Sequence, residues 1–258
     1  MRQWTWLAVG VVLGAGVGMA RSRKPVVREE VRVKVDGVTE RWRLEWKEPP
    51  ALACFETGGV SCPCEGFAQG ERGALELVRS RPGAPVERLP LSPLFADAGP
   101  GGAPPLAMLR GWEPAEDDES IDPDERLRVL GRRKRVRAMV LGDYDHDGQA
   151  REFVLQTQAY GCGMREAVLL GVDRRDGRVR ALGTAEHPDR PLVLEPQTWA
   201  MLRDSARIES VETPCGDHGS ELERVLRVSA DEKGLHATSE LYACTDTGRG
   251  ALSSSEVL

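Results

Sequence analysis

Three aspartates at alternate positions are the residues of this chain best suited to metal chemistry. Asp143, Asp145 and Asp147 are followed directly by Gly148. Ca²⁺ is a hard cation that takes six to eight oxygen ligands, and alternate carboxylates on a tightly curled loop can converge on one point. Glycine adopts the positive φ that such a sharp turn needs. The spacing therefore predicts a loop that binds Ca²⁺ through oxygen atoms.

The residues on either side of this loop predict strands rather than helices. Residues 136–141 before the loop and residues 153–157 after it are short, partly β-branched apolar runs, which are typical of strands. An EF-hand would need two amphipathic helices and a glutamate at loop position twelve, where this chain has Val154. We therefore expect a calcium loop between two strands. Its predicted ligands are the carboxylates of Asp143, Asp145 and Asp147, the Gln149 backbone carbonyl, and Glu152.

This strand–DxDxDG–strand order resembles the calcium loops of FG-GAP/VCBS repeats in integrin-type β-propellers. The resemblance covers about residues 139–170, and it implies one Ca²⁺ site in a β-rich protein. A propeller of several blades is not expected, because the chain has no second DxDxDG. The repeats carry their last acid three residues after the glycine, whereas Glu152 comes one position later, so its role as a direct ligand stays open. The alternatives are an acidic turn without a metal, or a loop that keeps the shape and binds weakly.

The N-terminus predicts export. Residues 4–20 form an apolar, glycine-rich run of 17 residues, and Gly18 and Ala20 place small residues where a signal peptidase prefers them. We interpret residues 1–20 as a cleaved secretory signal, which makes the protein secreted or periplasmic. Basic residues directly after the run favour the alternative of an uncleaved anchor. A membrane association is expected only in that case.

Six cysteines fit an exported chain that is held together by disulfides. We expect Cys215 to pair with Cys244, Cys54 to pair with one of Cys62 or Cys64, and Cys162 to pair with the other. The alternative is zinc bound by the three N-terminal cysteines and a histidine. Their Cys-Pro-Cys spacing differs from the usual C-x₂-C knuckle.

Alternating charged and apolar residues predict a β-hairpin near the N-terminus. Residues 28–35 and residues 40–46 both alternate, and Asp36-Gly37 between them is a strong turn signal. The hairpin places Trp42 and Trp46 on one face. Such a pair can be a sugar-stacking platform, but tryptophans at these positions are more often part of a core.

Further short strands and turns predict a mainly β fold, an antiparallel meander of hairpins. The only convincing helix is near residues 195–206, where Trp199 and Leu202 fall on one face. We expect an N-terminal β region with a cysteine-rich loop (26–95), a Gly/Pro and acidic linker (96–126), a C-terminal β region with the aspartate loop (127–246) and a flexible tail (247–258).

Composition and motifs exclude several functions. The net charge of −6 gives no reason to expect nucleic-acid binding, and the motifs of common hydrolases and nucleotide-binding proteins are absent. His146 is expected to point to solvent. Asp217 and His218 lie near Ser220 and allow a hydrolase as an alternative, although adjacent residues rarely form a triad. The favoured hypothesis is a non-enzymatic binding or structural protein of the cell envelope with a protein or glycan partner; another alternative is a membrane-anchored interaction module.

Overall fold

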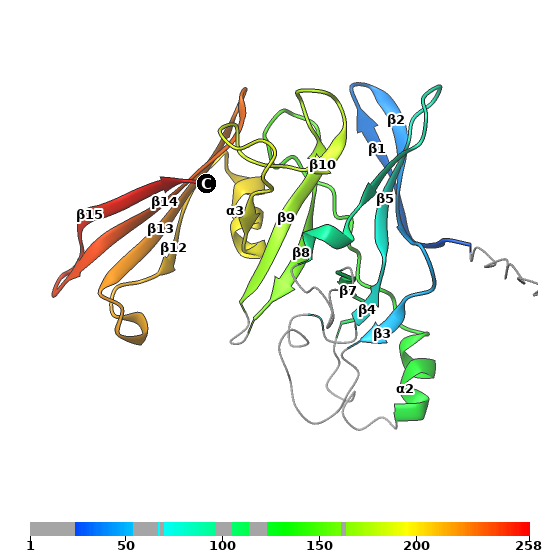
Figure 1. The fold of residues 1–258 in the computed structure, drawn as a ribbon, viewed down its shortest axis with the longest axis horizontal. Coiled ribbons are helices and arrows are strands. Elements are labelled where there is room, and N and C mark those ends of the chain that lie inside the picture. The colour runs from blue at the N-terminus through cyan, green and yellow to red at the C-terminus, as the bar shows by residue number, and fades with distance from the viewer. Residues whose placement is uncertain (1–23, 54–66, 68–69, 96–104, 114–122, 161–163) are drawn as a thin grey trace, which may run out of the picture.

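The computed structural model describes residues 24–53, 67, 70–95, 105–113, 123–160 and 164–258. In these residues the protein is mainly β, with four antiparallel sheets and two α-helices (Figure 1), which confirms the predicted fold class. The predicted helix is α3 (Pro196–Asp204). The other helix, α2 (Pro123–Leu130), was not predicted, because its sequence continues an acidic stretch that we assigned to the linker. Two 3₁₀ turns are η1 (Ser92–Leu94) and η4 (Asp217–Gly219).

The N-terminal sheet is built on the predicted hairpin. Its strands are β1 (Val26–Val35), β2 (Val38–Trp46), β5 (Leu75–Ser80) and β6 (Glu87–Pro90), in the order β1-β2-β5-β6. Asp36 and Gly37 both have positive φ and form the turn. Trp42 and Trp46 are completely buried, so they belong to a core and not to a sugar platform.

A small sheet lies beside the N-terminal sheet. It consists of β3 (Ala51–Ala53), β4 (Gly70–Gly73) and β7 (Ala107–Arg110). Strand β7 comes from the predicted linker, yet it pairs with β4 over its whole length. That part of the linker is therefore an integral strand of the fold.

The central sheet is organised around one strand. Its members are β8 (Phe153–Ala159), β9 (Arg165–Val172), β10 (Val179–Ala181) and β11 (Val193–Leu194), and β9 pairs with the other three. Because side chains alternate along a strand, Val168 and Leu170 enter a first core shared with the N-terminal sheet. Ala167 and Leu169 enter a second core on the opposite face. The two predicted β regions thus share the first core.

The C-terminal sheet covers the second core together with α3 (Figure 1). Its strands are β12 (Arg207–Thr213), β13 (Leu222–Asp231), β14 (Gly234–Thr245) and β15 (Gly248–Val257), paired in sequence order. The predicted Cys215–Cys244 disulfide is confirmed. The cysteines at 54, 62, 64 and 162, and the zinc alternative with them, lie outside the described residues.

Two predictions about strands need correction. Most of the tail 247–258 is a strand, β15, which the ladder hydrogen bonds to β14 hold in register although its side chains are small and polar. Residues 136–141 do not form a strand. There the side chain of Glu29 accepts the N–H groups of Ala138 at 2.7 Å and Met139 at 3.2 Å, so side chains replace a neighbouring strand as partners.

No helix among the described residues is both long and apolar enough to span a bilayer. The predicted signal, residues 1–20, lies outside the described residues.

Candidate metal site

The aspartate loop is closed at its base by two backbone hydrogen bonds. The Gly142 N–H donates to the Glu152 carbonyl at 2.9 Å, and the Glu152 N–H donates to the Gly142 carbonyl at 3.2 Å. We call residues 142–152 the metal loop. Gly148 has the positive φ of 85° that the sequence predicted for the turn. The loop leads directly into β8, so a rigid sheet positions its last residue.

Three carboxylates converge in the metal loop. Oxygen atoms of Asp143, Asp145 and Glu152 lie within 4.8 Å of one another. Asp145 is 4 % exposed and Glu152 is inaccessible to solvent. Three of the five predicted ligands are therefore brought together, and one of them is Glu152, whose role the sequence left open.

Two local features let Glu152 reach the cluster despite its late position. The Arg151 N–H donates to the Gln149 carbonyl at 2.9 Å, and this tight bend across three residues takes up the extra residue. On the neighbouring strand β9, Gly171 leaves room for the glutamate: a Cβ there would lie 2.7 Å from the Glu152 Cγ. The loop pattern had pointed to Glu152, but the space that Gly171 provides for it can be recognised only once β8 and β9 are paired.

The other two predicted ligands are occupied elsewhere. The Asp147 carboxylate forms an ion pair with Arg151 and lies 3.9 Å from the Arg174 Nε. The Gln149 side chain is tied to the β1–β2 turn: its Oε1 accepts the Asp36 N–H at 2.8 Å and its Nε2 donates to the Asp36 Oδ1 at 3.1 Å. The Gln149 carbonyl accepts the N–H of Arg151, as described above. Sequence spacing could not reveal these competing partners.

Hydrogen bonds orient the converging carboxylates and still leave room for a metal. Asp143 accepts the N–H groups of Asp147 at 3.0 Å and Gly148 at 2.9 Å. Asp145 accepts the Arg174 Nε at 2.8 Å through Oδ2 and the Asp147 N–H at 3.3 Å through Oδ1. An ionised carboxylate has about four acceptor positions, so lone pairs remain on both aspartates. All donors in the cluster are oxygen, which suits Ca²⁺, Mg²⁺ or Mn²⁺ better than soft metals.

The charges of the site are unbalanced when no cation is bound. Four carboxylates (Asp143, Asp145, Asp147 and Glu152) face two guanidinium groups, those of Arg151 and Arg174. When every carboxylate is ionised, the two missing positive charges equal those of one divalent ion.

Burial and the neighbouring acids raise the pKa of Glu152 strongly. Burial, followed by the charges of Asp145 and Asp147, raises its pKa from 4.5 to about 9, against the opposing Tyr144 N–H and Arg151. At neutral pH it therefore holds a proton in the metal-free protein. Its Oε1 accepts no hydrogen bond from any described residue, and the nearest cation, the Arg151 Nε, is 3.6 Å away. A buried oxygen without a hydrogen bond is costly, and a metal would satisfy it.

His146 does not point to solvent, so that prediction is wrong. Its φ is 53°, and its Nε2 lies 2.6 Å from the carbonyl oxygen of Leu202 in the last turn of α3. The left-handed backbone turns the ring away from the carboxylates and toward the helix. The contact depends on the docking of α3, which the sequence did not specify.

The alternative hydrolase residues form no catalytic arrangement. The His218 side chain is 95 % exposed, and its Nε2 lies 3.7 Å from the Asp217 carboxylate. The Ser220 hydroxyl donates to the Leu222 carbonyl at 2.6 Å. These side chains lie on the exposed turn next to the Cys215–Cys244 disulfide.

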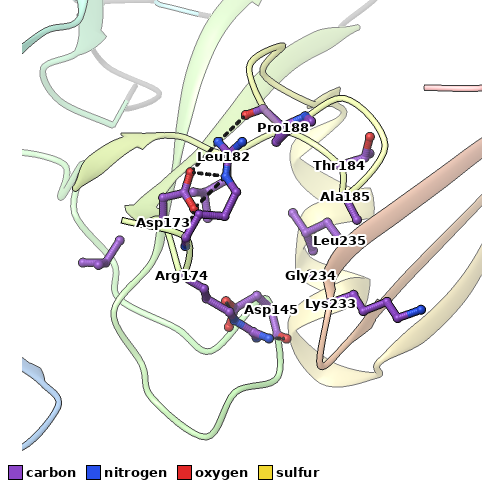
Figure 2. A pocket seen from close by; sticks show the side chains of 13 residues that line it. Asp145, Asp173, Arg174, Leu182, Thr184, Ala185, Pro188, Lys233, Gly234 and Leu235 are labelled. Atoms are coloured by element: carbon purple, nitrogen blue, oxygen red, sulfur yellow. Dashed lines mark hydrogen bonds and ion pairs between the residues drawn. The ribbon is translucent and has the colours of Figure 1, made fainter. Parts of the chain in front are cut away.

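A cavity of about 110 Å³ lies beside the metal loop (Figure 2). Asp145 and Arg174 form one wall, and residues 182–188 and the β13–β14 turn form the others. The Arg175–Asp173 ion pair also lines it. The cavity therefore lies between the metal loop and the β13–β14 turn of the C-terminal sheet.

The chain was compared with protein-family models, with curated proteins and with solved structures, and none of the three comparisons finds a match.

Proposed function

We propose that the protein is an exported, non-enzymatic binding or structural protein whose metal loop holds one structural Ca²⁺ ion. The ion would be held by Asp143, Asp145 and Glu152, with backbone carbonyls or water completing its shell. It would neutralise clustered carboxylates that otherwise repel one another. Its role would be to fix the loop and, with it, the first strand of the central sheet.

One observation carries this proposal: Glu152 is completely buried, one of its oxygens accepts no hydrogen bond from the described residues, and its carboxylate converges with those of two aspartates. Structural carboxylates in a protein interior are normally paired and hydrogen-bonded. When all four acids are ionised, as they would be around a cation, Arg151 and Arg174 compensate only half of their charge. The DxDxDG spacing and the exclusively oxygen donors favour Ca²⁺ over other divalent ions.

The compartment supports the same assignment. The Cys215–Cys244 disulfide indicates an oxidising, extracellular-like environment, where Ca²⁺ is plentiful. Secretion or a periplasmic location, and a protein or glycan partner, are parts of the proposal.

A thermal melt of the oxidised protein in Ca²⁺ and in EDTA tests the site. A ligand that binds only the folded state, at about 100 times its Kd, adds about 2.7 kcal/mol. For a chain of this size that corresponds to a rise of about 5–11 °C in Tm. The Asp145→Asn variant is expected to lose about half of this rise or more. The control is Asp246→Asn, because Asp246 is an exposed acid in the turn between β14 and β15, outside the metal loop.

Two outcomes would contradict the proposal. An unchanged Tm of the native protein in Ca²⁺ would leave the metal loop as an acidic turn. An equal rise in the native protein and in Asp145→Asn would place the ion elsewhere. The same melts in Mg²⁺ and Mn²⁺ identify which oxygen-preferring ion stabilises the protein most.

A further inference from the structure

We propose that metal binding in the loop regulates how firmly the C-terminal sheet docks on the central sheet. This inference rests on the proposed metal site and adds a regulatory role to it. Two side-chain contacts carry it: Arg174 links the metal loop to the β13–β14 turn, and His146 links the loop to α3.

Arg174 spans the gap between the loop and the C-terminal sheet. Its Nε donates to the Asp145 Oδ2 at 2.8 Å and its Nη2 donates to the Asp145 carbonyl at 2.7 Å. Its Nη1 donates to the carbonyls of Asp231 at 3.0 Å and Glu232 at 3.3 Å. Figure 2 shows Arg174 and Asp145 together on one side of the cavity and Gly234 of the turn across from them. One guanidinium therefore holds a proposed metal ligand and the β13–β14 turn at once.

His146 makes the corresponding link to α3. Its ring contacts the Leu202 carbonyl in the last turn of the helix at 2.6 Å. Within the helix, the Trp199 Nε1 donates to the Ala167 carbonyl of β9 at 3.0 Å, and the indole is completely buried in the second core. A change in the position of the metal loop is thus transmitted to the core that the C-terminal sheet covers.

The junction between the two sheets depends on few polar contacts near the cavity. Besides Arg174, three such contacts join the described residues here: the Ala185 N–H donates to the Leu235 carbonyl at 2.7 Å, the Thr184 hydroxyl donates to the Leu258 carbonyl at 2.6 Å, and the His236 Nδ1 lies 2.7 Å from Glu186. The cavity between them leaves this end of the junction incompletely packed. Regions with few packed contacts open locally at a lower free energy than the core does, so ordering one contact can shift the docking equilibrium.

The direction of the coupling follows from the two oxygens of Asp145. Oδ2 binds Arg174, while Oδ1 accepts one backbone N–H and keeps a lone pair for the metal. A cation at Oδ1 fixes the carboxylate without displacing the guanidinium, and a fixed carboxylate orders Arg174. Metal binding therefore strengthens docking, and by linkage docking strengthens metal binding.

Hydrogen–deuterium exchange of the full, oxidised chain in CaCl₂ and in EDTA tests the coupling, with calorimetry as a direct measure of Ca²⁺ binding. We expect Ca²⁺ to slow exchange about tenfold in peptides covering residues 231–237 and 196–204, within the usual range of coupling between sites. In Arg174→Met the metal loop should still gain protection, while residues 231–237 should no longer respond. In His146→Ala the response of residues 196–204 should be lost.

The matched control is Arg175→Met. Arg175 is adjacent in sequence and lines the same cavity, but it pairs with Asp173 and Asp189 rather than with the metal loop. This variant should keep the native response at both segments. Calcium binding without slower exchange at residues 231–237 in the native chain would overturn the regulatory inference alone, as would an undiminished response in Arg174→Met. Absence of any binding heat would overturn the metal site and this inference together.

Discussion

Replacing Glu152 by glutamine should change protein stability in opposite directions in EDTA and in high Ca²⁺. Glutamine keeps the size of the side chain but cannot ionise, and its amide can donate to the neighbouring carboxylates of Asp143 and Asp145. Without metal, native Glu152 must hold a proton in the folded state, because burial and two nearby aspartates raise its pKa to about 9. In the unfolded chain the same group ionises near its ordinary value of 4.5.

The size of the effect follows from these two pKa values. Between pH 4.5 and about 9 the unfolded state binds fewer protons than the folded state, so metal-free stability falls as the pH rises. Each pH unit contributes about 1.4 kcal/mol, and pH 7 lies about two and a half units above 4.5, which gives roughly 3.5 kcal/mol. The Glu152→Gln variant escapes this loss. In EDTA at pH 7 it should melt about 7–14 °C above the native protein, and its Tm should depend less on pH.

Calcium should reverse the order. The ion displaces the proton of Glu152 and gains a charged ligand, whereas the neutral amide of the variant is a weaker one. At about 100 times the Kd the native protein gains about 2.7 kcal/mol, and at about 1,000 times it gains about 4.1 kcal/mol. The advantage of Glu152→Gln should therefore shrink to a small remainder near the first concentration and become a disadvantage near the second.

Melts by circular dichroism at pH 5.5, 7 and 8.5 in both buffers measure this reversal. The control is Glu221→Gln, which replaces an exposed acid outside the metal loop and should change neither melt. A Glu152→Gln variant that is destabilised equally in EDTA and in Ca²⁺ would refute the reasoning. That result would mean that Glu152 is ionised in the metal-free protein and is stabilised by the Arg151 guanidinium, 3.6 Å away.

Three further predictions concern other parts of the fold. Asp145→Asn should weaken Ca²⁺ binding about tenfold or more, which corresponds to about 1.4 kcal/mol of binding free energy or more. Asp147→Asn should weaken the binding less. Calorimetry that ranks the two variants in the opposite order would show that the loop rearranges around the ion. Replacing Cys215 and Cys244 by serine should lower the free energy of unfolding by about 3–4 kcal/mol in urea titrations, and an unchanged midpoint would mean that the disulfide adds no stability. Arg79→Met should lower the free energy of unfolding by about 3–5 kcal/mol, because it removes the guanidinium that lies 2.6 Å from the buried Glu40 carboxylate in the native protein. A urea midpoint equal to that of the native protein would contradict this.

Local sequence was sufficient for features whose causes are local. Asp36-Gly37 can adopt the positive φ values of a tight hairpin turn, and alternation on either side predicted which residues would be buried. The α3 helix was visible from the spacing of Trp199 and Leu202, both completely buried. In each case the interactions that decide the structure lie within a few residues of one another. The same holds for the fold class, since short strands with short turns leave little choice but antiparallel pairing.

Long-range pairing decided the features that the sequence missed. The tail became β15 because β14 offers a free row of N–H and carbonyl groups, which no property of Gly248 to Val257 reveals. In residues 136–141, Glu29, more than a hundred residues away in sequence, accepts the N–H groups of Ala138 and Met139 in place of a neighbouring strand.

The metal loop shows both sources of information. Its sequence determined that carboxylates would gather on a tight turn, because alternate aspartates and a following glycine act over six residues. Which oxygens converge was decided by tertiary structure. Gly171 on the paired strand β9 makes space for Glu152, while Arg151 and Arg174 draw Asp147 away. The physical reason is that ligand position depends on burial and on competing charges, and both are set by segments that meet only when the sheets pack.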